Sequence, residues 1–142
     1  MKFLSIPVFS ISAPGESPAV FEICANAGNR TLFYGLYGSS LIAFEPNPAT
    51  AALIRGKCIE NRLDLVAILQ NALSDNASTL ELLLSEGCNI GTASLEFAVG
   101  TTTITAEVVP SDAAPETKAL NRMYFTRIDV EGHAFQISAG LD

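Results

Sequence analysis

The chain of 142 residues is close to the length of a single domain, at roughly 150 residues per domain. Apolar residues make up 49% of it and charged residues only 16%, the opposite of the balance in disordered chains. The formal net charge of −7 repels phosphate backbones and argues against a nucleic-acid partner. Low charge with high apolar content favours a parallel sheet covered on both faces.

Residues 1–13 weakly resemble a secretory signal, because one basic residue precedes a short apolar stretch. Pro7 interrupts that stretch, so we expect an ordinary strand or loop and keep a cleaved signal as the alternative. No apolar run reaches the roughly 18 residues that span a bilayer. The cysteines Cys24, Cys58 and Cys88 have neither metal-site spacing nor the pattern of a disulfide framework. We therefore expect reduced thiols, a cytoplasmic location, no membrane span and no bound metal.

The first half of the chain alternates between strand and helix patterns. A turn cluster at residues 12–18 separates an N-terminal strand or loop segment, residues 1–18, from a domain at residues 19–142. The elements expected next are a strand at 19–23, a small-residue loop at 24–29, a helix at 30–37, a strand at 41–44, a helix from 48 to about 61 and a strand at 65–69. Asn47 is the expected N-cap of the second helix, with Pro48 at its first position.

The pattern changes after the third strand and residues 71–75, which follow it. The segments with β-branched residues or alternating polarity that follow are expected to form antiparallel hairpin strands at 79–84, 93–99 and 102–109. The last expected elements are a short helix within 111–122, a strand at 124–130 and a helix that begins at 133. The fold class is therefore α/β, with a mostly parallel, doubly wound sheet and a β-hairpin insertion.

Ligands of open parallel sheets bind beyond the carboxyl ends of the strands, and polar residues follow the strands here. The first strand leads into the loop Cys24–Gly28, whose small residues let a ligand approach the backbone. Glu45 follows Glu22 by 23 residues, near the spacing at which an acid accepts the hydroxyls of a ribose. The alternatives are a tight turn for the loop and an exposed acid before a turn for Glu45. An NAD-type site is disfavoured because the loop lacks the G-x-G-x-x-G pattern.

Five segments, in order, resemble the FkbM family of S-adenosylmethionine-dependent methyltransferases. Residues 22–29, EICANAGN, are similar to the family's D-I-G-A-N-I-G loop, and residues 42–48, IAFEPNP, to its A-F-E-P-N-P segment. Residues 71–75 resemble its n-A-L-S-D stretch, residues 89–95 its glycine-serine segment, and residues 127–132, RIDVEG, its K-I-D-V-E-G motif. The resemblance covers residues 19 to 141.

This resemblance implies a Rossmann-like domain that binds S-adenosylmethionine and methylates a hydroxyl oxygen on a sugar or small natural product. The cofactor-binding residues that it implies are Glu22, Cys24, Ala25, Asn26, Gly28, Glu45, Asn47, Ala72, Leu73 and Ser74. Asp129 and Glu131 would face the methyl donor and acceptor as the catalytic residues. Asp129 is the candidate base, or else a carboxylate that only positions the ligands.

Four positions depart from the family pattern. Glu22 replaces an aspartate, Cys24 a loop glycine and Arg127 a lysine, while Ala134 stands where the family has a second glutamate. The family's sheet also continues beyond the helix near residue 133, so the resemblance implies a sheet that is incomplete at its C-terminal end. The alternative function is therefore an inactive nucleoside-binding domain. A homodimer that pairs the open sheet edge is a further expectation.

Overall fold

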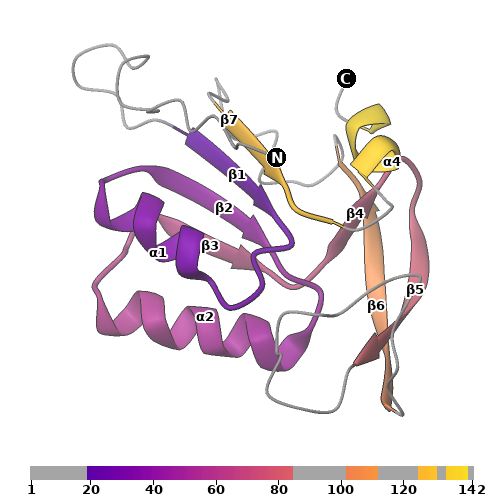
Figure 1. The fold of residues 1–142 in the computed structure, drawn as a ribbon, viewed down its shortest axis with the longest axis horizontal. Coiled ribbons are helices and arrows are strands. Elements are labelled where there is room, and N and C mark those ends of the chain that lie inside the picture. The colour runs from indigo at the N-terminus through magenta and orange to yellow at the C-terminus, as the bar shows by residue number, and fades with distance from the viewer. Residues whose placement is uncertain (1–18, 85–101, 112–124, 131–133, 141–142) are drawn as a thin grey trace, which may run out of the picture.

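The computed structural model describes residues 19–84, 102–111, 125–130 and 134–140 (Figure 1). Four parallel strands form sheet A in the order β3-β2-β1-β7. Their bounds are β1 Ala19–Ile23, β2 Ser40–Phe44, β3 Val66–Leu69 and β7 Phe125–Ile128. Since successive side chains of a strand point to opposite faces, the apolar runs of β1 and β2 supply both faces of the sheet.

Two helices, α1 Asn29–Leu36 and α2 Pro48–Glu60, cover one face of sheet A. Val20, Leu41 and Ala43 of the strands pack there against Tyr34 of α1 and Ile54 of α2. Helix α2 begins as its sequence predicts. Its Asn47 side chain accepts a hydrogen bond from the backbone N–H of Ala49 at 3.0 Å, and a proline occupies the first helical position.

The opposite face of sheet A packs against a different set of elements. Phe21, Ile23, Ile42 and Phe44 alternate with the residues named above and form a second core cluster. That cluster contains Leu73 of strand β4, Ala72–Ser74, and Ile137 of helix α4, Ala134–Ala139. The sheet is therefore covered on both faces, by helices on one and by β4 and α4 on the other.

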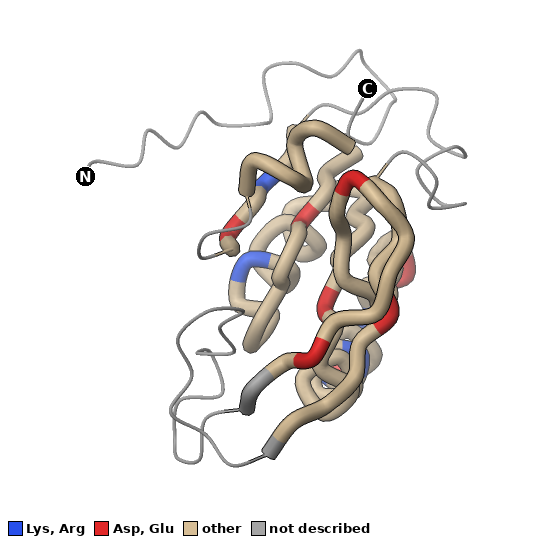
Figure 2. The backbone as a smooth tube through the Cα atoms, turned by 90° about the vertical axis from the view of Figure 1, so that its right-hand side faces the viewer, with Lys and Arg blue, Asp and Glu red and all other residues tan. Residues whose placement is uncertain are grey.

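Sheet B is a separate three-stranded sheet with the order β4-β6-β5. Strands β5, Ser78–Leu84, and β6, Thr102–Pro110, pair antiparallel, which confirms the hairpin-type pairing expected for this region. The sequence predicts no element of its own at residues 71–75, and strand β4 forms there, parallel to β6, with Ala72 opposite Val108. The charged residues on the strands of sheet B are acidic, and these strands carry neither Lys nor Arg (Figure 2).

The predicted α/β class, with a mostly parallel Rossmann-like sheet, is confirmed. Each predicted helix and strand in the described ranges lies within a few residues of an observed one. The strand expected at 93–99 and the helix expected within 111–122 lie outside the described residues, apart from Ser111. None of the helices in the described ranges is long and apolar enough to cross a membrane.

Candidate functional site at the carboxyl ends of sheet A

The carboxyl ends of the strands in sheet A come together at one edge. Ile23 of β1 is level with Phe44 of β2 and with Ile128 of β7. The residues that follow these three positions are Cys24, Glu45 and Asp129. The backbone N–H of Asp129 donates to the carbonyl of Ile23 at 3.3 Å, which fixes the end of β7 beside the end of β1. The register thus gathers the predicted residues that follow β1, β2 and β7.

The loop between β1 and α1 has an unusual backbone. Cys24, Asn26 and Gly28 all have left-handed φ angles, of 60°, 53° and 76°. Only glycine adopts this region without a steric cost, so the cysteine at position 24 carries backbone strain of about 1–2 kcal/mol. The loop is held from outside as well: the Lys57 ammonium of α2 donates to the carbonyl of Ala27 at 2.6 Å.

Gly28 and Ala25 serve the packing of this loop. A side-chain carbon on Gly28 would lie 2.9 Å from Cγ1 of Ile54, so its hydrogen lets α2 approach the loop. Ala25 is buried in the core beneath α1 and α2, and its N–H donates to the carbonyl of Phe44 at 3.1 Å. Both small residues therefore have structural roles in the folded chain.

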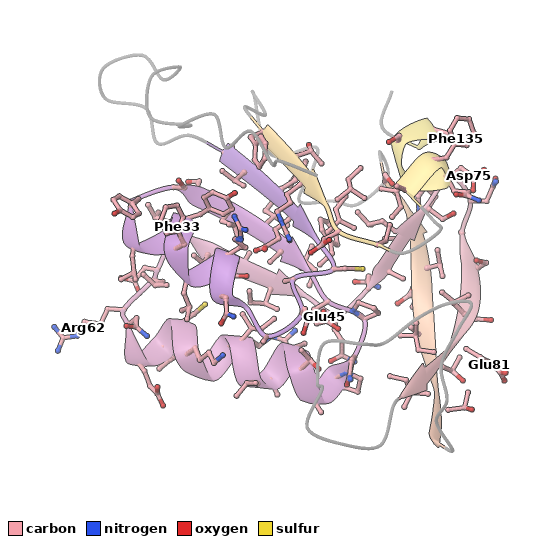
Figure 3. All side chains as sticks on the ribbon, viewed as in Figure 1. Phe33, Glu45, Arg62, Asp75, Glu81 and Phe135 are labelled. Atoms are coloured by element: carbon pink, nitrogen blue, oxygen red, sulfur yellow. The ribbon has the colours of Figure 1, made fainter. Side chains whose placement is uncertain are left out.

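Glu45 ties the end of β2 to the loop after β1 (Figure 3). One carboxylate oxygen accepts the backbone N–H of Asn26 at 2.8 Å, and the other accepts that of Asn47 at 3.0 Å. The residue is only 5% exposed. Burial raises the pKa of its carboxyl, and the N–H groups of Asn47 and Asn26 partly offset that rise. Because each oxygen has a second lone pair, the carboxylate can still accept hydrogen bonds from a ligand.

Glu22 is fully buried on the face of sheet A that α1 covers. One of its oxygens accepts the hydroxyl proton of Thr31 at 2.6 Å, and the other lies 3.4 Å from Nη1 of Arg127. Burial raises the pKa of the Glu22 carboxyl, while Thr31, Arg127 and then Arg30 act to lower it. Asp129 forms an ion pair with Nη2 of the same Arg127 and is largely exposed.

The thiol of Cys24 records the electrostatic field at this edge. Its pKa is raised to about 12, mainly by burial and also by the negative charges of Glu45 and Asp129, which outweigh the positive charge of Arg127. The thiol is therefore protonated at neutral pH. Since Glu45 and Asp129 outweigh Arg127 at this position, the charges at the edge favour a cation, whereas burial by itself disfavours charge of either sign.

Ala72, Leu73 and Ser74 lie on β4 of sheet B. Leu73 packs in the same core cluster as Ile23 and Phe44, the last residues of β1 and β2. The carbonyl of Ser74 accepts from both the backbone N–H and the hydroxyl of Ser111, at 3.0 and 3.1 Å. Glu131 lies outside the described residues, and so do Cys88 and His133.

The sequence interpretation assigned no site role to Thr31 or Lys57, and it named Arg127 only as a departure from the family motif. The signal for Arg127 is its spacing, because a residue two positions before Asp129 in a strand points to the same face. The signal for Thr31 is its place in the first turn of the helix after Glu22. Within the described ranges, no group of three His, Cys, Asp or Glu side chains is arranged to hold a metal ion.

Comparisons with known proteins place the chain in a family. Solved structures of WbdD are among the matches, one of them described as a bifunctional kinase-methyltransferase. The first has 14% sequence identity and a TM-score of 0.39, and the alignment covers 41% of this chain and 13% of the WbdD chain. This likeness is too slight to assign a function, and no curated protein matches the chain. The profile of the methyltransferase FkbM domain matches residues 22–140, so the chain belongs to the methyltransferase FkbM domain family.

Proposed function

We propose that this protein is an S-adenosylmethionine-dependent methyltransferase that acts on a hydroxyl oxygen of a sugar or small natural product. The observation that carries the proposal is the meeting of Glu45, the loop Cys24–Gly28 and Asp129 at one edge of a parallel sheet. Membership of the FkbM methyltransferase family supports the reaction class. The hydroxyl acceptor is an expectation from that family resemblance.

The residues at this edge fit the proposed cofactor in charge and in hydrogen bonding. S-adenosylmethionine supplies a methyl group activated on a positively charged sulfonium. The negative field at Cys24, to which Glu45 and Asp129 contribute, would favour that cation. The lone pairs left on the Glu45 carboxylate would accept the ribose hydroxyls, next to the loop residue Asn26 that the carboxylate already holds.

Asp129 is the described residue best placed to handle the acceptor. Its carboxylate is exposed, unlike that of Glu22, so it can reach a molecule outside the sheet. We assign it the task of accepting the proton of the acceptor hydroxyl or of orienting that hydroxyl. Glu131, two residues further along the chain, remains a second catalytic candidate on sequence grounds.

A second candidate function is binding of a nucleoside without catalysis. The left-handed Cys24 favours it, because a side chain now occupies a loop position where the family pattern has glycine. Glu45 also accepts two hydrogen bonds from the protein itself and is almost fully buried. The loop already hydrogen-bonds to the Glu45 carboxylate, so a ligand would have to share that carboxylate with the protein backbone.

Calorimetric titration with S-adenosylhomocysteine tests the cofactor assignment. We expect binding, and we expect Glu45→Ala to lower the affinity by at least about tenfold, the usual size of a hydrogen bond to a charged group. Glu60→Ala, which removes an exposed acid at the end of α2, is the matched control and should bind as the wild type does. Absence of binding at millimolar ligand would refute the proposal.

Transfer of a labelled methyl group separates the two candidates. Incubation with labelled S-adenosylmethionine and a panel of sugars and small hydroxylated compounds should give a methyl ether if the protein is an active enzyme. Binding without transfer to any compound favours the nucleoside-binding alternative. Sedimentation equilibrium tests the homodimer that we propose alongside this function.

A further inference from the structure

Four side chains form a continuous chain of contacts from the interior of sheet A to its exposed edge. The Thr31 hydroxyl donates to Glu22, Glu22 is paired with Nη1 of Arg127, and Nη2 of Arg127 is paired with Asp129. The exposed fraction of the side chain rises along this chain, from 0% for Glu22 to 23% for Arg127 and 65% for Asp129. Arg127 thus contacts both the buried and the exposed carboxylate.

The strand register produces this arrangement. Glu22 of β1 and Arg127 of β7 are directly paired neighbours in the parallel ladder. Arg127 and Asp129 are two residues apart along an extended chain, so both point to the face on which α1 lies. Their neighbours Ile128 and Val130 point the other way, into the second core cluster. The pairing of β1 with β7 therefore brings the side chains of Glu22, Arg127 and Asp129 next to one another.

The two ion pairs of Arg127 are not equal in strength. A pair with an exposed carboxylate such as Asp129 contributes little by itself, commonly less than about 1 kcal/mol, and does not hold two long side chains in place. A fully buried carboxylate is different, because it is strongly destabilised unless a partner offsets its charge. Glu22 therefore holds Arg127 in place, and Arg127 in turn restrains Asp129.

We propose that Arg127 is a positioning residue, which fixes the Asp129 carboxylate at the ligand-binding edge by anchoring it to the buried Glu22. The proposal rests on the function proposed above, since it assigns a role to Asp129 in that reaction. Glu22 then acts on the bound ligand through Arg127 and Asp129. Glu22 is completely buried. That burial agrees with an indirect role and does not agree with a direct contact between Glu22 and the cofactor.

The identity of residue 127 matters for this role. A guanidinium has two outer nitrogens in a rigid fork, and here one nitrogen faces each carboxylate. A lysine has a single charged nitrogen on a flexible stem, so it can pair closely with only one of the two. The family motif K-I-D-V-E-G has lysine at this position. The arginine of this chain can therefore bridge two carboxylates where a lysine would pair with one.

Nuclear magnetic resonance of the free protein tests the bridge without any ligand. We expect separate resonances for the two Nη atoms of Arg127, because the paired guanidinium cannot rotate freely. Glu22→Gln and Asp129→Asn should each bring these resonances toward a single averaged signal. Arg55→Met is the matched control, since Arg55 donates to the Ile68 carbonyl on another part of the sheet. An averaged Arg127 signal in the wild type overturns the bridge.

Asp129 contributes to the negative field that we propose favours the sulfonium, so binding of S-adenosylmethionine tests whether the bridge acts through Asp129. We expect Arg127→Met to lower the affinity by roughly tenfold, a typical coupling for side chains in contact. In the Asp129→Asn background the same substitution should have no further effect. Additive losses, or unchanged affinity of Arg127→Met, overturn the proposal, because a purely structural role does not depend on Asp129.

Arg127→Lys serves as a second variant in case Arg127→Met does not fold. It retains the charge beside Glu22, so we expect a folded protein that binds as weakly as the methionine variant. Full affinity of Arg127→Lys overturns the two-nitrogen bridge. If the wild type binds neither S-adenosylmethionine nor S-adenosylhomocysteine, the proposed function fails, and the resonance experiment still decides whether Arg127 restrains Asp129.

Discussion

Gly28 offers the sharpest test of how the loop after β1 is built. Its φ angle is 76°, and an added side-chain carbon would lie 2.9 Å from Cγ1 and 3.0 Å from Cγ2 of Ile54. Gly38 has nearly the same φ angle, 78°, but an added carbon there meets nothing within 4 Å. The two glycines therefore separate backbone strain from steric overlap.

The expected cost of Gly28→Ala combines three contributions. Left-handed backbone costs a non-glycine residue about 1–2 kcal/mol, and overpacking against the buried Ile54 costs about 1–3 kcal/mol more. Reduced freedom of the unfolded chain returns about 0.4–1 kcal/mol. We expect Gly28→Ala to lower the free energy of unfolding by about 1–5 kcal/mol, and Gly38→Ala, without the overlap, by about 0–2 kcal/mol.

Urea denaturation followed by circular dichroism measures both costs. A further variant isolates the overlap, because Ile54→Ala removes the two nearest of the three Ile54 carbon atoms that an alanine at position 28 would meet. In that background, Gly28→Ala should cost no more than Gly38→Ala does in the wild type. Equal costs for the two glycines in the wild type, or an undiminished cost in the Ile54→Ala background, would refute the reasoning.

Three further predictions concern the residues around this loop. Because Cys24 has a φ angle of 60°, Cys24→Gly should be at least as stable as Cys24→Ala in urea denaturation; the reverse order, normal for extended or helical residues, would contradict the strain. Burial raises the pKa of the Glu22 carboxyl above the ordinary 4.5, so the folded protein holds this proton more tightly than the unfolded chain does. The resulting stabilisation is fully present below pH 4.5 and is lost as the pH rises through the raised pKa. Glu22→Gln should therefore gain stability relative to the wild type as the pH rises above 4.5, and a difference that does not vary with pH in urea denaturation would contradict this. Asn47→Ala should lower the stability measured by thermal denaturation by about 1 kcal/mol, because the N-cap is lost. Asn47→Asp should keep most of that stability, because aspartate also caps a helix; equal losses in both variants would exclude the cap as the cause.

Local patterns in the sequence predict most of sheet A and both helices on its first face. The apolar runs of β1 and β2, the Asn47-Pro48 helix start and the helical spacing of Ala51, Ile54 and Cys58 each depend on residues close together in the chain. Strand β4 could not be predicted in this way. It has only three residues, too few for an alternating pattern, and its partner on β6 begins opposite Val108, far along the chain.

The candidate site shows the same division between local and non-local information. Residues that follow parallel strands must meet at one edge, so the positions of Glu45 and Asp129 could be predicted from strand order alone. The burial of Glu22 and its pairing with Arg127 depend on the register between β1 and β7, which no local pattern specifies. The role of Gly28 likewise depends on how closely α2 approaches the loop.

The pairing of β1 with β7 also has a consequence for how the chain folds. Glu22 and Arg127 are 105 residues apart in sequence, whereas β1, β2 and β3 with their two helices form one continuous stretch. Contacts within that stretch close short loops, and the β1–β7 contacts close a long one that costs more chain entropy and forms more slowly. During synthesis, the edge of β1 that receives β7 stays open to other strands until residue 128 has been added. The candidate site therefore forms later than the β1–β3 stretch, and a chaperone that shields this edge should increase the yield of folded protein more than one that acts on α1 or α2.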